Sequence, residues 1–247
     1  MAARSWQAVE VASRTDVGRV RGSNQDACGT FEDPRGDRLF VVADGMGGHR
    51  GGEVASALAV EAVAEACGAS DAPPAERLRE AVAAANQRIF ERSRQDPGVA
   101  GMGTTVVTLL LAREGTAWVA HVGDSRLYRL REGRLEALTE DHSLVAELQR
   151  QGYLDGDEAA RHPRRNELIR SVGCLPEVEP DLAELDLAPG DRLLLCTDGL
   201  CGAVEADSIA AGLGEATPDL AARTLVDLAN ASGGEDNVTV QVVQVPD

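Results

Sequence analysis

The stretch VVADGMGGHRGGEVAS (residues 41–56) places one carboxylate, Asp44, directly after an apolar run. Residues 40–43 are all apolar and predict a buried strand that stops on Asp44. Five of the next eight residues are glycine, which permits positive φ angles and close approach of the backbone to another group. The Ala-rich segment 51–66 has the spacing of a helix packed on one face. The stretch suits a bound cation or phosphate, and it equally suits an ordinary strand–turn–helix corner.

Composition restricts the class of protein. A chain of 247 residues can bury one substantial core, so we expect a single domain over residues 1–247, present as a monomer. The formal net charge of −17 argues against nucleic acid or an anionic membrane as partner. No apolar run approaches the roughly 18 residues of a membrane span, and the N-terminus lacks an apolar signal core, which predicts a cytoplasmic protein. Five cysteines without CxxC spacing predict reduced thiols.

The apolar periodicity predicts hairpins and a few helices. Segments 104–122 and 126–138 each have the pattern of a hairpin, and consecutive hairpins indicate antiparallel sheet. This excludes a doubly wound nucleotide-binding fold and favours an α+β domain in which helices lie outside packed sheets. The expected helices cover 53–67, 76–95, 205–213 and 218–231, and the expected strands cover 6–12, 38–43, 104–113, 116–122, 126–131, 134–138, 192–197 and 237–245.

Four further aspartates stand in loops or at strand ends. Each alone is typical of a turn or capping residue, but the order strand–Asp–Gly occurs twice, at Asp44 and at Asp198. Asp236 follows two glycines and precedes a strand, while Asp124 lies between the two hairpins. The last is Asp26, which follows Arg21 by five residues.

Such carboxylates predict a metal site if the fold gathers them. Unpaired carboxylates repel one another and are costly to desolvate, so a cluster is stable only around cations. Oxygen ligands without Cys or His indicate Mg²⁺ or Mn²⁺. Two such ions can deprotonate a bridging water, and the planar fork of Arg21 suits a phosphate. The residues therefore predict a two-metal phosphoester hydrolase.

Seven motifs in this chain resemble those of the PP2C-type, metal-dependent protein serine/threonine phosphatases, particularly the compact bacterial members. They occur in the family's order and span about residues 6–244: TDVGRVRGSNQDA, VVADGMGGH, GMGTT, VGDSRLY, LTEDHS, CTDGL and GGEDNVT. The resemblance implies a four-layer αββα sandwich of two antiparallel β-sheets flanked by helices. It implies hydrolysis of phosphoserine and phosphothreonine in proteins by a hydroxide bridging two Mg²⁺ or Mn²⁺ ions. The implied partners are phosphorylated proteins, namely bacterial Ser/Thr kinases and their substrates.

The resemblance also implies residue roles. Asp44 would bridge both metals and the Gly45 carbonyl would bind one of them, which would explain why the motif combines a carboxylate with bare backbone. Asp26 would hold metal-bound water, and Arg21 would bind the substrate phosphate. A flap over about residues 144–173 would meet the phosphoprotein. The remaining implied ligands are Asp198 and Asp236 in the two tight sites and Asp124 in a third, weaker site.

Two positions depart from the eukaryotic pattern of the family. Met46 stands where those enzymes have a histidine proposed as general acid, and Gln25 replaces a glutamate. Both substitutions are common in the bacterial branch. They leave the proton donor to the leaving alkoxide without an assigned side chain, and we expect a metal-bound water to fill that role.

The histidines receive separate interpretations. His121 lies in a predicted strand and is expected in the core, while His142 is expected as a packing or hydrogen-bonding turn residue. His49 suits either a contact with metal-bound water or a cap on the following helix, and His162 is expected in a solvated loop. Among other residues, Arg161, Arg164 and Arg165 suit either attraction of phosphorylated substrate or mere solubility, and Thr104 and Thr105 are expected to be structural.

Two other classes of function remain as alternatives. A non-catalytic phosphatase-fold module would usually have lost metal aspartates, whereas Asp44, Asp198 and Asp236 are all present. A two-metal hydrolase of nucleotides or sugar phosphates is disfavoured, because aromatic residues make up only 3% of the chain and no Walker-type loop occurs. A regulatory phosphatase that acts on an anti-sigma antagonist is a variant of the leading hypothesis.

Overall fold

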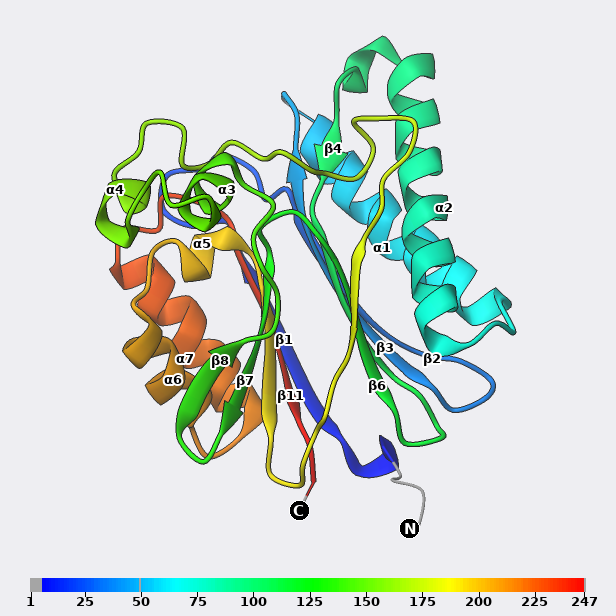
Figure 1. The fold of residues 1–247 in the computed structure, drawn as a ribbon, viewed down its shortest axis with the longest axis vertical. Helices are drawn as coiled ribbons and strands as arrows, with labels where there is room; N and C mark the ends of the chain where they lie inside the picture. Colours follow the sequence, from blue (N-terminus) through cyan, green and yellow to red (C-terminus); the bar gives the residue numbers. More distant parts are fainter. Residues whose placement is uncertain (1–5, 49, 247) are drawn as a thin grey trace.

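The computed structural model describes residues 6–48 and 50–246. Two antiparallel sheets pack face to face, and helices cover the outer face of each sheet (Figure 1). The α+β class and the four-layer αββα arrangement predicted from the sequence are confirmed.

Each sheet brings together strands that lie far apart in the chain. The first has the order β1-β11-β10-β7-β8, and the second has the order β2-β3-β5-β6-β9, with β4 paired to the end of β3. The strands of the first sheet are β1 (Glu10–Asp16), β7 (Arg126–Arg131), β8 (Arg134–Ala137), β10 (Arg192–Cys196) and β11 (Val238–Gln244). Those of the second are β2 (Asp26–Glu32), β3 (Arg38–Met46), β4 (Gly103–Thr104), β5 (Val106–Leu111), β6 (Ala117–Val122) and β9 (Asp181–Glu184).

The helices divide between the two outer faces. The long pair α1 (Gly51–Ala69) and α2 (Pro74–Gln95) covers the second sheet, and α6 (Ala206–Leu213) and α7 (Pro218–Ala231) cover the first (Figure 1). The short helices α3 (Leu144–Arg150) and α4 (Gly156–Ala160) lie in the predicted flap, and α5 (Asp198–Cys201) follows β10. Single 3₁₀ turns are η1 (Trp6–Ala8) and η2 (Pro97–Val99). Over residues 6–48 and 50–246, no helix combines the length and apolarity needed to cross a membrane.

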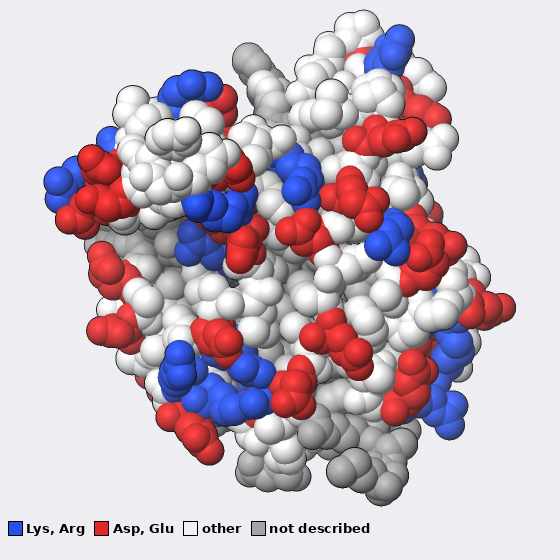
Figure 2. Space-filling view, viewed as in Figure 1, with Lys and Arg blue, Asp and Glu red and all other residues white. Residues whose placement is uncertain are grey.

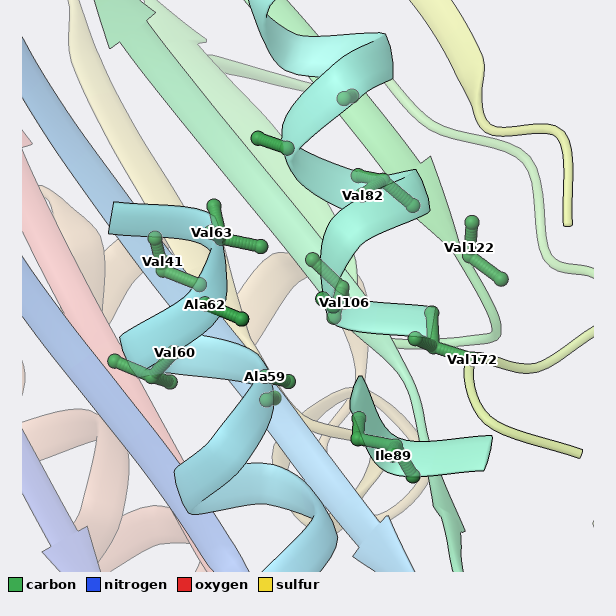
Figure 3. Packing of buried hydrophobic residues seen from close by; sticks show 14 of the residues in the cluster. Val41, Ala59, Val60, Ala62, Val63, Val82, Ile89, Val106, Val122 and Val172 are labelled. Atoms are coloured by element: carbon green, nitrogen blue, oxygen red, sulfur yellow. The ribbon is translucent and has the colours of Figure 1, made fainter. Parts of the chain in front are cut away.

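Four layers create three apolar interfaces, which explains why β3 is apolar on both faces. Leu39, Val41 and Ala43 pack against α1 and α2 in the cluster drawn in Figure 3. Phe40 and Val42 alternate with them and point into the space between the sheets. A central strand between two packed layers must bury both sets of side chains, so it reads as a continuous apolar run.

Several predicted boundaries were wrong. β1 covers residues 10–16 rather than 6–12, because its pairing with β11 begins at Glu10, while residues 6–8 form η1 and the Trp6 indole donates to the Ala112 carbonyl. The strand that was predicted to stop on Asp44 continues to Met46, since Gly45 and Met46 pair with β4. The predicted strand 104–113 is divided between β4 and β5. β2, β9 and the flap helices were not anticipated.

Candidate metal centre

Loops from both sheets converge on one pocket at the edge of the sandwich. The pocket has a volume of about 740 Å³, and its lining includes four aspartates and one arginine that come from separate parts of the chain. These side chains are Arg21, Asp44, Asp124, Asp198 and Asp236. Asp26 lies on the neighbouring strand β2, directly opposite Asp44 in the β2–β3 register.

The Asp26–Asp44 pair is an unusual feature of the sheet. Directly opposite side chains in an antiparallel pair lie roughly 5 Å apart at Cβ, and like charges there are destabilising. The Thr197 hydroxyl donates to Asp26 Oδ2 at 2.9 Å, while Asp26 Oδ1 is buried with no protein hydrogen-bond partner. The fold therefore holds two carboxylates together without a protein cation between them.

Two threonines fix the backbone at Asp44. The Asp44 amide donates to Thr105 Oγ1 at 2.9 Å, and the Asp44 carbonyl accepts from Thr104 Oγ1 at 2.8 Å and from the Thr105 amide at 2.9 Å. Thr105 Oγ1 also lies 2.6 Å from Ser125 Oγ, next to Asp124. The structural role predicted for Thr104 and Thr105 is confirmed, because together they position the segments that carry Asp44 and Asp124.

Close backbone packing explains the Asp–Gly order at both sites. A Cβ on Gly45 would lie 2.0 Å from the Gly52 carbonyl oxygen at the start of α1, and a Cβ on Gly199 would lie 1.9 Å from the Asn237 carbonyl oxygen. Any side chain at either position would push an aspartate-bearing segment away from its neighbour.

Asp198 and Asp236 meet the pocket from the first sheet. Asp198 is the first residue of α5, and its Oδ1 is buried with no protein hydrogen-bond partner. Asp236 precedes β11 and forms an ion pair with Arg21, at 2.7 Å between Oδ2 and Nη2. The Arg21 side chain is 53% exposed, so this cation stands at the mouth of the pocket.

Asn237 is a positioning residue that sequence reasoning missed. Its buried side chain accepts from the Gln25 amide at 2.8 Å and donates to the Val17 and Ser23 carbonyls at 2.9 and 3.0 Å. It thereby ties the loop that bears Arg21 to the segment that bears Asp236. The signal was available, because Asn237 directly follows Asp236 in the GGEDNVT motif.

Burial and mutual repulsion raise the pKa of the clustered carboxyls. Burial is the main cause for Asp26 and Asp124, and each has its pKa raised to about 7. Burial followed by the charge of Asp26 raises the pKa of Asp44 well above its usual range, and burial and Asp236 raise that of Asp198. Arg21 offsets part of this effect at Asp198 and Arg126 part of it at Asp124, but burial and repulsion outweigh both.

The donor set fits hard divalent cations. Oxygen donors predominate, and two of them, on Asp26 and Asp198, are buried and unpartnered. In the described part of the chain, no three Asp, Glu, His or Cys side chains are drawn into a ready coordination shell. One oxygen of a further pocket carboxylate, Asp236, is engaged by Arg21 instead.

The Asp124 loop is held by a histidine. The Gly123 amide donates to His142 Nδ1 at 3.1 Å, and the His142 amide donates to the Gly123 carbonyl at 2.8 Å. This confirms His142 as a hydrogen-bonding turn residue. His121 packs against it with ring centroids 4.6 Å apart and is buried, which confirms its place in the core. Burial lowers the pKa of both imidazoles, that of His121 to about 4.

The remaining predicted residues that the structure describes do not line the pocket. His162 lies in a loop of the flap and is partly exposed, and its Nδ1 accepts from the Arg164 amide at 3.2 Å. Arg164 forms an ion pair with Glu167 at 2.6 Å, while Arg161 and Arg165 are exposed. Figure 2 shows arginines gathered over the flap and over the β7–β8 hairpin, with carboxylates between them. His49 lies outside the described residues.

A sandwich of this topology with an aspartate-lined pocket at its edge defines a protein phosphatase of the PP2C class. The family described as protein phosphatase 2C matches residues 19–232, and the chain belongs to this family. The serine/threonine phosphatase stp of Listeria monocytogenes is 40% identical over 237 residues, which cover 94% of each chain.

Solved structures agree with this assignment. The S. agalactiae serine/threonine phosphatase superposes with a TM-score of 0.90 at 38% identity, over 96% of this chain and 99% of that one. The Mycobacterium tuberculosis serine/threonine phosphatase PstP gives a TM-score of 0.88 at 37% identity, over 97% and 99%. A structure of the PstP catalytic domain in complex with two manganese ions gives 0.85 at 37% identity, over 97% and 99%.

Proposed function

We propose that this phosphatase hydrolyses phosphoserine and phosphothreonine in proteins, with two Mg²⁺ or Mn²⁺ ions, and so opposes bacterial Ser/Thr kinases. The observation that carries the proposal is the pocket in which Asp44, Asp124 and Asp198 face Arg21. Carboxylates that share a buried site need cations, and a phosphate monoester needs both cations and a planar donor. The names of the relatives and the manganese-bound neighbour support the same reaction.

The ligands are assigned by position. Asp44, at the centre of the cluster, would bridge the two tightly bound ions, with the Gly45 carbonyl on one of them. Asp198 and Asp236 would complete the direct ligands, and Asp26 would hold water on an ion through its unpartnered Oδ1. When bound, the ions would acidify a water held between them and so supply the hydroxide nucleophile for phosphorus.

The other pocket residues serve the phosphate and the leaving group. Arg21 would exchange its ion pair with Asp236 for the phosphate oxygens, because its exposed guanidinium can reach outward. Asp124, held through Gly123 by His142, would bind a third and weaker ion, and its water would protonate the leaving alkoxide. Met46 lines the same pocket and has no proton to donate.

The substrates would be phosphorylated proteins that meet the flap, and these include Ser/Thr kinases and their targets. The single-domain organisation, the monomeric state, the cytoplasmic location and the absence of nucleic-acid or membrane partners remain predictions.

The proposal is tested by dephosphorylation of a phosphothreonine peptide with Mn²⁺, before and after treatment with EDTA and desalting, beside a phosphotyrosine peptide. We expect turnover of phosphothreonine only with added metal, and much slower turnover of phosphotyrosine. Undiminished turnover after metal removal would contradict the mechanism, and a preference for phosphotyrosine would contradict the substrate class.

A further inference from the structure

The pocket has a second wall with a different chemistry from its carboxylate floor. Residues 168–178 form this wall and contribute Leu168, Ile169, Leu175 and Val178 to the pocket lining. Ile169 is 49% exposed and Leu175 is 64% exposed, although both are large apolar residues. These four residues are the apolar wall. It is continuous with the pocket that contains Asp44.

Hydrogen bonds with a side chain of α2 hold the part of the wall that carries Leu175. The buried Asn86 side chain donates to the Leu175 and Pro176 carbonyls at 3.0 and 3.1 Å and accepts from the Gly173 amide at 2.7 Å. Gly173 has a φ of +90°, and a Cβ there would lie 2.1 Å from the Ile89 side chain. Backbone bonds between Val172 and Thr104 extend this attachment to β4.

An apolar surface that is already ordered in the free protein favours the binding of a ligand that covers it. The backbone of the Leu175 loop is already ordered, so a ligand that covers it does not need to order that loop. Apolar area removed from water contributes about 25 cal/mol per Å². A ligand that reaches the carboxylate floor and also covers the apolar wall is therefore favoured over one that reaches the floor alone.

The charges beside the wall select against acidic ligands. Glu177 and Glu179 line the same pocket, and Glu179 forms an ion pair with Arg79 at 2.9 Å. The nearby cation, Arg170, is engaged in an ion pair with Asp181 at 2.5 Å and donates to the Glu179 carbonyl. An acidic side chain placed here would meet the Glu177 carboxylate, while the guanidiniums of Arg79 and Arg170 are already engaged in ion pairs.

We propose that the apolar wall is a specificity subsite that receives an apolar side chain adjacent to the phosphorylated residue of the substrate polypeptide. This inference rests on the proposed function, because it assumes that the phosphorylated side chain enters the same pocket. It deepens that function by naming the sequence context of the substrate. The occupant is a segment of the phosphoprotein, since the wall and the phosphate-binding residues share one continuous pocket.

The test uses phosphothreonine peptides that differ at one flanking position, with Leu, Ala or Glu there, prepared separately for the preceding and the following residue. With Mn²⁺, we expect kcat/KM for the Leu peptide to exceed that for the Ala peptide by about tenfold on one side of the phosphothreonine. The Glu peptide should be slower than the Ala peptide.

Protein variants connect this preference to the wall. Leu175→Ala should reduce the Leu-to-Ala ratio of kcat/KM to near one, and the exposed side chain makes a folding defect easy to exclude by circular dichroism. Leu220→Ala is the matched control, because this leucine is partly exposed on α7 outside the pocket. It should retain the ratio of the unmodified protein.

The possible results separate the inference from the function. Equal rates for the three peptides, or an unchanged ratio in Leu175→Ala, would overturn the subsite while leaving the phosphatase function intact. Failure to hydrolyse any phosphothreonine peptide with Mn²⁺ would overturn both. A dimer in sedimentation experiments that dissociates on Leu175→Ala would show that a second copy of the chain covers the wall instead.

Discussion

Arg21 and Asp236, which are 215 residues apart in the chain, form an ion pair at the mouth of the pocket with 2.7 Å between Nη2 and Oδ2. A cation bound by Asp236 and a phosphate bound by Arg21 would each replace one half of this pair. On the proposed function, the two groups would remain partners with each other until metal and substrate arrive.

Arg21→Ala should weaken phosphate binding without weakening metal binding. Loss of a charge-assisted planar donor is expected to raise KM for a phosphopeptide about 10- to 100-fold. Asp236 loses its competing cation, so Mn²⁺ affinity measured by calorimetry should stay level or rise. Arg19→Ala serves as control, because Arg19 is an exposed arginine in the same loop. A large fall in Mn²⁺ affinity would instead assign Arg21 to the scaffold of the metal centre.

Metal binding should strengthen with pH across neutrality. Asp26 and Asp124 have their pKa raised to about 7 from the ordinary 3.8, so the folded metal-free protein binds more protons than the unfolded chain between these values. Its stability therefore falls as pH rises through this window. Because Mn²⁺ must displace these protons, the Mn²⁺-induced rise in Tm should be larger at pH 8 than at pH 6. Equal rises at both pH values, in scanning fluorimetry, would contradict this linkage.

Asp44→Asn should separate activity from stability. Loss of the charge at the centre of the cluster is expected to reduce turnover by about 10²-fold or more. The same change removes the repulsion with Asp26 across the β2–β3 pair, so the metal-free variant should unfold at a higher temperature than the unmodified protein at pH 8. Near-normal activity would show that the carboxylate is structural.

A buried aspartate that does have a partner provides the contrast. Asp37 is buried and forms an ion pair with Arg77 on α2. Asp37→Asn breaks this pair and should destabilise the protein by about 3 kcal/mol, while its dependence on Mn²⁺ is retained. The two substitutions remove the same charge and should have opposite effects on Tm.

The sequence predicted the layers and most of the site because both depend on local patterns. The apolar run 40–43 indicates a strand buried between two packed layers. In each strand–Asp–Gly order, the glycine lies where two backbone segments are in close contact. The register that sets Asp26 opposite Asp44 was not predictable, since β2 (DACGTFE) carries no apolar alternation and becomes a strand only through its pairing with β3. Neither was the attachment of the Leu175 loop to Asn86, which depends on contacts 89 residues apart.

His121 should make the protein sensitive to acid. Burial lowers its pKa from 6.5 to about 4, so the unfolded chain takes up a proton before the folded protein does. The associated stability is fully present above pH 6.5 and is lost as the pH falls toward 4, on the order of 3 kcal/mol in total. Titration of Asp26 and Asp124 changes the stability in the opposite direction over the same pH range. The contribution of His121 is therefore measured as the difference between the unmodified protein and a variant that lacks this histidine.

Urea unfolding at pH 7.5 and pH 5 measures this effect. The unmodified protein should lose about 2 kcal/mol more between these pH values than His121→Leu does, because leucine has no proton to gain. His162→Leu, in the flap, is the control and should behave like the unmodified protein. The same loss in all three proteins would show that His121 does not contribute to acid sensitivity.

Asp124→Ala should remove leaving-group chemistry and spare the two tight metal sites. The loop at Gly123 is held by its paired hydrogen bonds with His142, at 3.1 and 2.8 Å, and these do not involve the Asp124 side chain. Asp124 lines the pocket beside Asp44 and Asp198, so its removal also lowers the repulsion in the metal-free protein. We therefore expect the variant to fold and to bind two Mn²⁺ ions tightly.

The loss of turnover should depend on the leaving group. A serine or threonine alkoxide needs a proton as it departs, whereas the phenolate of an aryl phosphate leaves without one. Asp124→Ala should consequently lose more kcat on a phosphothreonine peptide than on an aryl phosphate, by at least about tenfold. Calorimetry for metal stoichiometry, run beside both assays, distinguishes the outcomes. Equal losses on the two substrates would remove Asp124 from protonation of the leaving group, and loss of a tightly bound ion would make it a ligand of the central pair.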